Sequence, residues 1–78
     1  MKMMNNNVGK RHGHIGNYYP DAGFGFIVCE ADESSYYFHN IGVKFPHEEI
    51  ATGKAVSFDV EDTPFTRAIN IELMDSER

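Results

Sequence analysis

Short runs of alternating side chains, separated by turn-forming residues, constrain the fold of this chain more than any other feature. Five runs have the period of two that is typical of half-buried strands; they cover residues 14–19, 24–30, 35–39, 54–60 and 66–73. The first turn, at 20–23, begins with Pro and Asp and ends with Gly, a sequence that favours a tight hairpin turn. A second turn is predicted at 31–34. The pattern therefore indicates an all-β fold.

A chain of 78 residues has room for one domain of modest stability. Closing a small sheet into a barrel removes its exposed edges, and five strands is the number that the OB-type barrel uses. We predict an all-β, five-stranded antiparallel OB-type Greek-key barrel over residues 12–74, with a flexible tail at 1–11 and a polar end at 75–78. Residues 40–53 are predicted to be a long connection with one helical turn at 45–50.

Two aromatic segments lie close together in the sequence. Residues 23–27 are Gly-Phe-Gly-Phe-Ile and residues 36–39 are Tyr-Tyr-Phe-His. Rings displayed on neighbouring strands can form a platform for unstacked nucleotide bases, each stacked base contributing roughly 1–3 kcal/mol. Core packing is the commoner fate of Phe in a strand, so alternation alone does not decide which rings face outward.

The formal net charge is −5, which argues against binding to duplex DNA or to a membrane surface through a broad basic surface. Residues 1–14 hold three basic and no acidic residues, whereas 15–78 hold four basic and twelve acidic ones. The basic residues at the start are either a local basic arm on an acidic body or a solubilising tail.

No pattern predicts an enzyme, a metal site or a cofactor. Cys29 is the only cysteine, which excludes an internal disulfide and a Cys-based zinc site, and we expect its thiol to be buried. His12 and His14 are interpreted as polar residues of an exposed strand, since no spacing supplies three or four converging ligands. Residues 1–7 contain no apolar run and are therefore neither a secretory signal nor a membrane span. Together with the single cysteine, which fits a reducing compartment, this predicts a soluble, cytoplasmic protein without a membrane partner. We expect it to be a monomer.

From residue 13 to residue 73 the chain resembles the cold-shock domain family, whose members are OB-type barrels that bind single-stranded RNA and DNA. Four anchors carry the resemblance in order and spacing: Ala-Gly-Phe-Gly-Phe-Ile at 22–27, Tyr-Tyr-Phe-His-Asn at 36–40, Gly-Lys-Ala-Val-Ser-Phe at 53–58 and Ala-Ile-Asn-Ile at 68–71. The first motif also partly fits an RRM, but that fold needs two helices and the opposite motif order.

The resemblance assigns the faces of the strands. It implies that four residues stack on bases, namely Phe24, Phe26, Tyr37 and His39. It places in the interior Ile27, Tyr36, Phe38, Val56 and Phe58. A buried Tyr36 hydroxyl would then need a partner or a route to the surface.

Several positions depart from the family pattern. Lysine positions of the family fall on His14, Gly16 and Ala22, its surface tryptophan on Asn17, and a phenylalanine on Asn40. The residues that can replace these contacts are Tyr18, Tyr19 and, in loops, Phe45, Phe65 and Arg67. Tyr18 is the one at which the family also has a ring. The predicted binding residues are therefore Phe24, Phe26, Tyr37, His39, Tyr18, His14, Phe45 and Arg67.

Two functional hypotheses follow. The first is binding of single-stranded RNA or DNA by base stacking, with a role as an RNA chaperone or in gene regulation, as the resemblance implies. The second is an OB module that binds a protein partner through the same exposed rings, because aromatic patches are also hot spots of protein interfaces. The net charge of −5 favours the second hypothesis and the four ring positions favour the first, which we prefer.

Overall fold

The computed structural model describes residues 11–62 and 64–74, which form five strands and two short 3-10 helices. The strands are β1 (Arg11–Tyr19), β2 (Phe24–Cys29), β3 (Ser35–His39), β4 (Ala55–Glu61) and β5 (Arg67–Leu73). The 3-10 helices are η1 (Asn40–Gly42) and η2 (His47–Glu49). One sheet contains all the strands in the order β3-β2-β1-β4-β5, with antiparallel pairing throughout. The predicted five-stranded all-β fold is confirmed.

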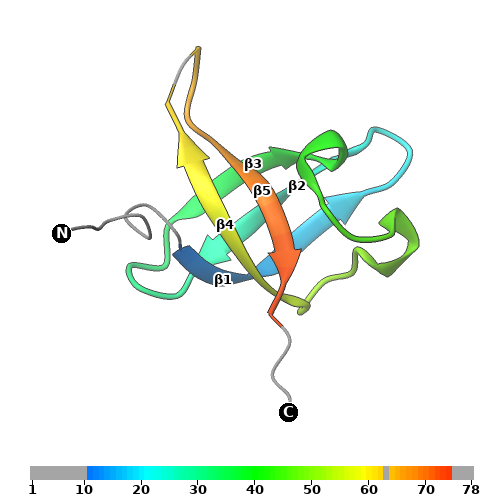
Figure 1. The fold of residues 1–78 in the computed structure, drawn as a ribbon, viewed down its shortest axis with the longest axis horizontal. Coiled ribbons are helices and arrows are strands. Elements are labelled where there is room, and N and C mark those ends of the chain that lie inside the picture. The colour runs from blue at the N-terminus through cyan, green and yellow to red at the C-terminus, as the bar shows by residue number, and fades with distance from the viewer. Residues whose placement is uncertain (1–10, 63, 75–78) are drawn as a thin grey trace, which may run out of the picture.

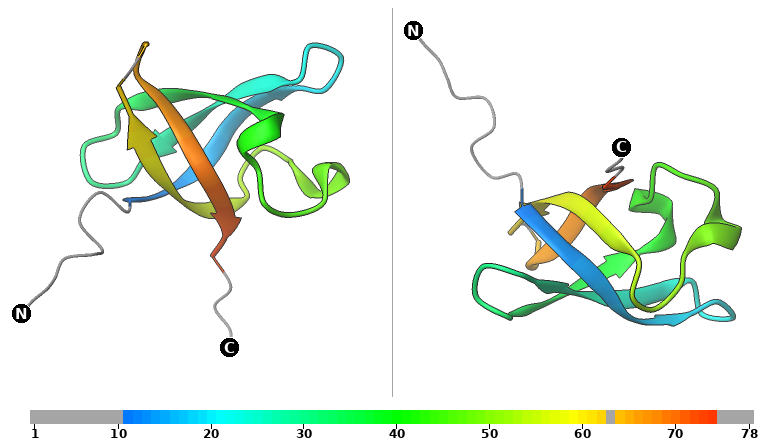
Figure 2. Two further views of the ribbon diagram at one scale, coloured as in Figure 1. Left: turned by 45° about the horizontal axis from the view of Figure 1, so that its top comes forward. Right: turned by 90° about the horizontal axis from the view of Figure 1, so that it is seen from below.

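The sheet is rolled so that its two edge strands meet. β4 and β5 cross over the ribbon that β1, β2 and β3 form (Figures 1 and 2), and β3 is in contact with β5. After β3, Val43 forms a parallel bridge with Ile71, and the Lys44 backbone N–H donates to the Ile71 carbonyl at 2.7 Å. Within the described residues β3 and β5 remain the edges of the ladder, so the barrel is partly open, as OB-type barrels are.

The core lies between the two layers and consists of apolar side chains from all five strands. Its fully buried members are Ile15, Ile27, Cys29, Phe38, Val56, Phe58 and Ile71. The interior positions predicted for Ile27, Phe38, Val56 and Phe58 are confirmed, each with 0% exposure, and the Cys29 thiol is buried as expected.

Tyr36 packs against this core and is partly buried. Its hydroxyl accepts a hydrogen bond from Arg11 Nη1 at 3.5 Å, and the Arg11 guanidinium carbon lies 5.7 Å from the centre of the Tyr36 ring. The partner that a half-buried phenol needs is therefore supplied by the first residue of β1.

The element boundaries differ slightly from those predicted. β1 begins at Arg11 rather than at 14, because Arg11 and His12 pair with Phe58 and Ser57 of β4. The predicted helical turn is η2, which follows Pro46, whereas η1 was not predicted. The predicted tail at 1–11, Arg11 excepted, and the polar end at 75–78 lie outside the described residues.

Both predicted hairpin turns are present. The Tyr19 carbonyl accepts hydrogen bonds from the backbone N–H groups of Ala22 and Gly23, and Gly23 has a φ of +80°, which glycine adopts without strain. In the second turn the Asp32 carboxylate accepts a hydrogen bond from the Ser34 backbone N–H at 3.0 Å. This bond holds the pKa of Asp32 below its usual value.

Candidate functional site

The pairing of β2 with β3 places the two aromatic segments side by side in the sheet. Phe24 is opposite His39 and Phe26 is opposite Tyr37. Along β2 the burial alternates strictly, with Phe24, Phe26 and Val28 half-buried between fully buried neighbours. Because successive side chains of a strand point to opposite faces, the rings lie on the outer face while the core residues lie beneath them.

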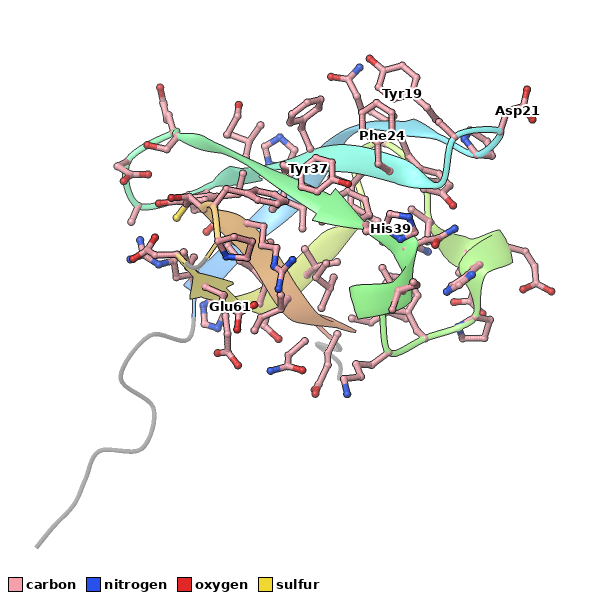
Figure 3. The ribbon with its side chains drawn as sticks, turned by 90° about the horizontal axis from the view of Figure 1, so that it is seen from above. Tyr19, Asp21, Phe24, Tyr37, His39 and Glu61 are labelled. Atoms are coloured by element: carbon pink, nitrogen blue, oxygen red, sulfur yellow. The ribbon has the colours of Figure 1, made fainter. Side chains whose placement is uncertain are left out.

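Five rings form a continuous surface, which we call the aromatic platform; its members are Tyr19, Phe24, Phe26, Tyr37 and Phe65. Phe24 and Tyr37 stack with centroids 5.8 Å apart and planes inclined by 30°, and Phe26 meets both edge-on at 6.0 and 6.3 Å. Tyr19 lies 5.2 Å from Phe24, and Phe65 lies 5.8 Å from Tyr37. Figure 3 shows Tyr19, Phe24 and His39 following one another across β1, β2 and β3, with Tyr37 to one side of them.

Tyr18 does not join the aromatic platform. The β1–β2 register shifts between Ile15 and Asn17, a bulge that reverses which residues of β1 face outward. Tyr18 therefore points inward, where its ring stacks on Phe38 and its hydroxyl accepts a hydrogen bond from Asn40 Nδ2 at 3.2 Å. Tyr19, 46% exposed, takes the outer position.

Two other predicted residues also lie apart from the aromatic platform. His14 is exposed in β1, where it pairs with Val28 of β2 and Ala55 of β4. Phe45 is half-buried and packs against the core. Phe45 therefore contributes to core packing, and His14 lies opposite Val28, two residues along β2 from Phe26.

His39 is exposed at the end of β3, and its ring is held by the backbone that follows. Nδ1 accepts a hydrogen bond from the Ile41 backbone N–H at 3.1 Å. A neutral imidazole that accepts at Nδ1 carries its proton on Nε2. His39 therefore offers an N–H donor beside the stacked rings.

Arg67 lies next to the aromatic platform, but its positive charge is already paired with the carboxylate of Glu61. Its guanidinium carbon is 5.5 Å from the centre of the Phe65 ring. Nε donates to Glu61 Oε1 at 3.1 Å and Nη2 donates to the same oxygen. Glu61 thus neutralises the cation that the sequence suggested for binding.

A groove continues from the aromatic platform between η1 and the start of β5. Its volume is about 310 Å³, and the residues that line it include Tyr37, His39, Ile41, Phe65, Arg67 and Ile69. Ile41 is 82% exposed and Phe65 is 50% exposed. We call this hollow the apolar groove.

The described part of the chain contains no cluster of three or more His, Cys, Asp or Glu side chains that could hold a metal ion. Among the same residues, none of the helices has the length and apolarity needed to cross a membrane.

A five-stranded OB-type barrel with outward rings on β2 and β3 defines a cold-shock-domain-like fold, and a comparison with solved structures bears this out. The chain is similar to the Drosophila Unr cold-shock domains CSD456, with a TM-score of 0.75 and 26% sequence identity over 87% of this chain. The chain spans 28% of the length of that structure. No protein-family model and no curated protein matches the sequence. The chain is accordingly a divergent example of the fold.

Proposed function

We propose that the chain binds single-stranded RNA or DNA by stacking bases on the aromatic platform. The observation that carries the proposal is the contact between Phe24 and Tyr37, two rings from neighbouring strands that stack at 5.8 Å on the outer face. A core role does not account for them, because the core is complete beneath them with Ile27 and Phe38 at 0% exposure. The likeness to the Unr cold-shock domains supports the same function.

Preference for single strands follows from the stacking. A ring platform can contact only bases that have left the duplex stack, and it tolerates any sequence because every base has a π-face. Binding of this kind shifts nucleic acids away from hairpins, which is the basis of an RNA-chaperone or gene-regulatory role. Few basic contacts accompany the rings, so we propose a weak affinity with a shallow dependence on salt.

A titration with a seven-nucleotide oligothymidine and with a duplex, followed by amide NMR shifts at low salt, tests the proposal. The expected result is binding of the single strand with shifts centred on β2 and β3, and none with the duplex. An absence of binding at high micromolar strand would refute it. Phe24→Ala with Tyr37→Ala should weaken binding by about thirtyfold or more, since two stacked bases contribute roughly 1–3 kcal/mol each. Tyr36→Phe, on the opposite face of β3, is the matched control.

The exposed rings also suit a protein partner. Tyr19 and Phe65 are each about half exposed, and the net charge of −5 would favour a basic partner. If the oligonucleotide leaves the amide shifts of the aromatic platform unchanged, this second function becomes the better explanation of the rings.

A further inference from the structure

His12 and His14 lie side by side on the outer face of β1. Both are exposed, whereas Gly13 between them and Ile15 after them are buried. Residues two apart on a strand point to the same face, so the two imidazoles project from backbone positions about 6.6 Å apart. Neither ring forms a hydrogen bond or an ion pair with another described residue. The nitrogens of both rings are therefore available to a ligand.

The backbone that carries the two rings is fixed from both sides. β1 is the central strand of the sheet, between β2 and β4. His12 pairs with Ser57 of β4 and its carbonyl accepts a hydrogen bond from the Glu30 backbone N–H at 2.9 Å, while His14 pairs with Ala55. The side chains beside the pair on β4 are short, which leaves room above the strand for further ligands of an ion.

We propose that His12 and His14 chelate one divalent transition-metal ion, with water in its remaining coordination positions. Metal–nitrogen distances are about 2.0–2.1 Å, so two ligand atoms at right angles around an ion are about 3 Å apart. Each ring then has to lean toward the other by about 2 Å, which an exposed side chain does by rotating about its χ angles. The site lies apart from the aromatic platform and is independent of the proposed function.

The ligand set indicates which ion binds best. Among the described residues no group of three or more His, Cys, Asp or Glu side chains converges, so the pair does not form a closed four-ligand zinc site. Imidazole suits copper, nickel and zinc, and among divalent ions of the first row Cu²⁺ binds a given nitrogen site most strongly. Glu30 follows β2 beside His12, and Glu72 lies opposite Ser57; their negative charges favour a cation on this face.

A titration of the chain with copper(II) chloride, without nucleic acid, tests the proposal. Paramagnetic broadening of amide NMR signals should be centred on residues 12–14 and on the facing residues Val28, Ala55 and Ser57, with one ion bound per chain. His12→Asn and His14→Asn should each lower the affinity at least about tenfold, because the second metal–ligand bond of a chelate forms within the complex. Both positions are exposed, so thermal unfolding should show that the variants keep the fold.

His47→Asn is the matched control, since His47 lies in η2 and not on β1. It removes the same chemical group and should leave the affinity for Cu²⁺ unchanged. If all three Asn variants bind like the wild type, or if the broadening is centred away from β1, binding is adventitious and the inference is wrong. An absence of Cu²⁺ binding to the wild type at millimolar metal would also refute it.

A gain of affinity tests the geometry directly. Ala55 is exposed and lies opposite His14, with Cβ atoms about 5 Å apart in such a pair. Ala55→His should therefore add a third imidazole and raise the affinity for Zn²⁺ at least about tenfold, because three histidines are a known zinc ligand set. Ala51→His, at an exposed position before β4, adds a histidine away from the pair and should not. Equal affinities of these two variants would contradict the proposed position of the ion.

Discussion

Tyr18 and Phe38 stack against each other on the inner face of the sheet, with ring centroids 6.0 Å apart and planes inclined by 15°. Gly25 lies between them in the register, paired with Tyr18 on one side and Phe38 on the other. A Cβ atom at Gly25 would lie 2.2 Å from the Asn17 carbonyl oxygen and 2.8 Å from Phe38 Cε1. The second glycine of the Gly-Phe-Gly-Phe motif is therefore required for packing beneath the platform.

Gly25→Ala should destabilise the fold by about 3 kcal/mol, because the added methyl group meets backbone as well as the Phe38 ring. For a domain of this size the loss lowers the Tm by roughly 4–8 °C per kcal/mol. Gly42→Ala is the control, since its Cβ would have no neighbour closer than 3.6 Å. Thermal unfolding followed by circular dichroism measures both; equal Tm values would contradict the prediction.

Replacing Tyr19 should affect binding, whereas replacing its neighbour Tyr18 should affect stability. Tyr19→Ser removes a ring from the aromatic platform and should weaken single-strand binding about fivefold, with the free energy of unfolding changed by less than about 0.5 kcal/mol. Tyr18→Ser removes the partner of Phe38 and should lower stability by about 2 kcal/mol. Urea unfolding and oligothymidine titration of both variants measure the two effects. If Tyr18→Ser lost affinity but kept the stability of the wild type, the inward position that the bulge of β1 gives to Tyr18 would be wrong.

Glu61→Gln should release the charge of Arg67. The guanidinium then becomes available to a phosphate, so affinity for a single strand should rise at low salt and the slope of log K against log salt should steepen by about 0.7. Glu72→Gln, an exposed acid of β5, makes the same change in net charge. Equal slopes for these two variants would show that Arg67 gains no phosphate contact.

Asn70 has a φ of +51° within β5, and its Nδ2 donates to Asp59 Oδ2 at 3.0 Å. Asn70→Ala should cost about 2 kcal/mol, because it combines the left-handed backbone penalty of roughly 1–2 kcal/mol with the loss of this hydrogen bond. Asn70→Gly loses the hydrogen bond but tolerates the backbone conformation, so it should cost less. The order of the two variants in urea unfolding separates the contributions; a more stable Ala variant would argue against backbone strain.

Asp32 should make stability depend on pH at the acidic end. Its pKa is lowered in the folded chain by the Ser34 backbone N–H, so its contribution is present above the unfolded value of 3.8 and is lost as pH falls through the folded pKa. Asp32→Ala should be less stable than the wild type at neutral pH, and the gap should close in acid. Asp32→Asn keeps an acceptor for Ser34 but cannot titrate, which makes it the control. A gap that stays constant down to low pH would contradict the assignment.

The strands could be predicted because their alternation is local. A period of two places apolar residues on one face whatever the rest of the chain does, so the five runs became five strands with shifts of a few residues at their ends. The inward placement of Ile27 and Phe38 came from the resemblance, since alternation alone left both faces of β2 and β3 open. The parallel bridge from Val43 to Ile71 joins distant residues and had no signal in the sequence.

The candidate site was predicted less completely than the fold. A bulge in β1 exchanged the roles of Tyr18 and Tyr19, and the signal available was Gly16, because glycine inside a strand pattern often marks a bulge. The proximity of Phe65 to Tyr37 depends on how β4 and β5 cross over the other strands, which no local pattern reports. The pairing of Arg67 with Glu61 likewise requires the geometry of the β4–β5 hairpin.

The alternation along β2 assigns each residue to one of two selective pressures. Gly25 and Ile27 are constrained by the packing of the interior, while Phe24 and Phe26 are constrained by any ligand that binds on the outer face. Evolution can therefore exchange the outer set, and the charges around it, without disturbing the inner one. A lineage built this way can drift far in sequence while keeping its backbone, and its ligand can change faster than its architecture.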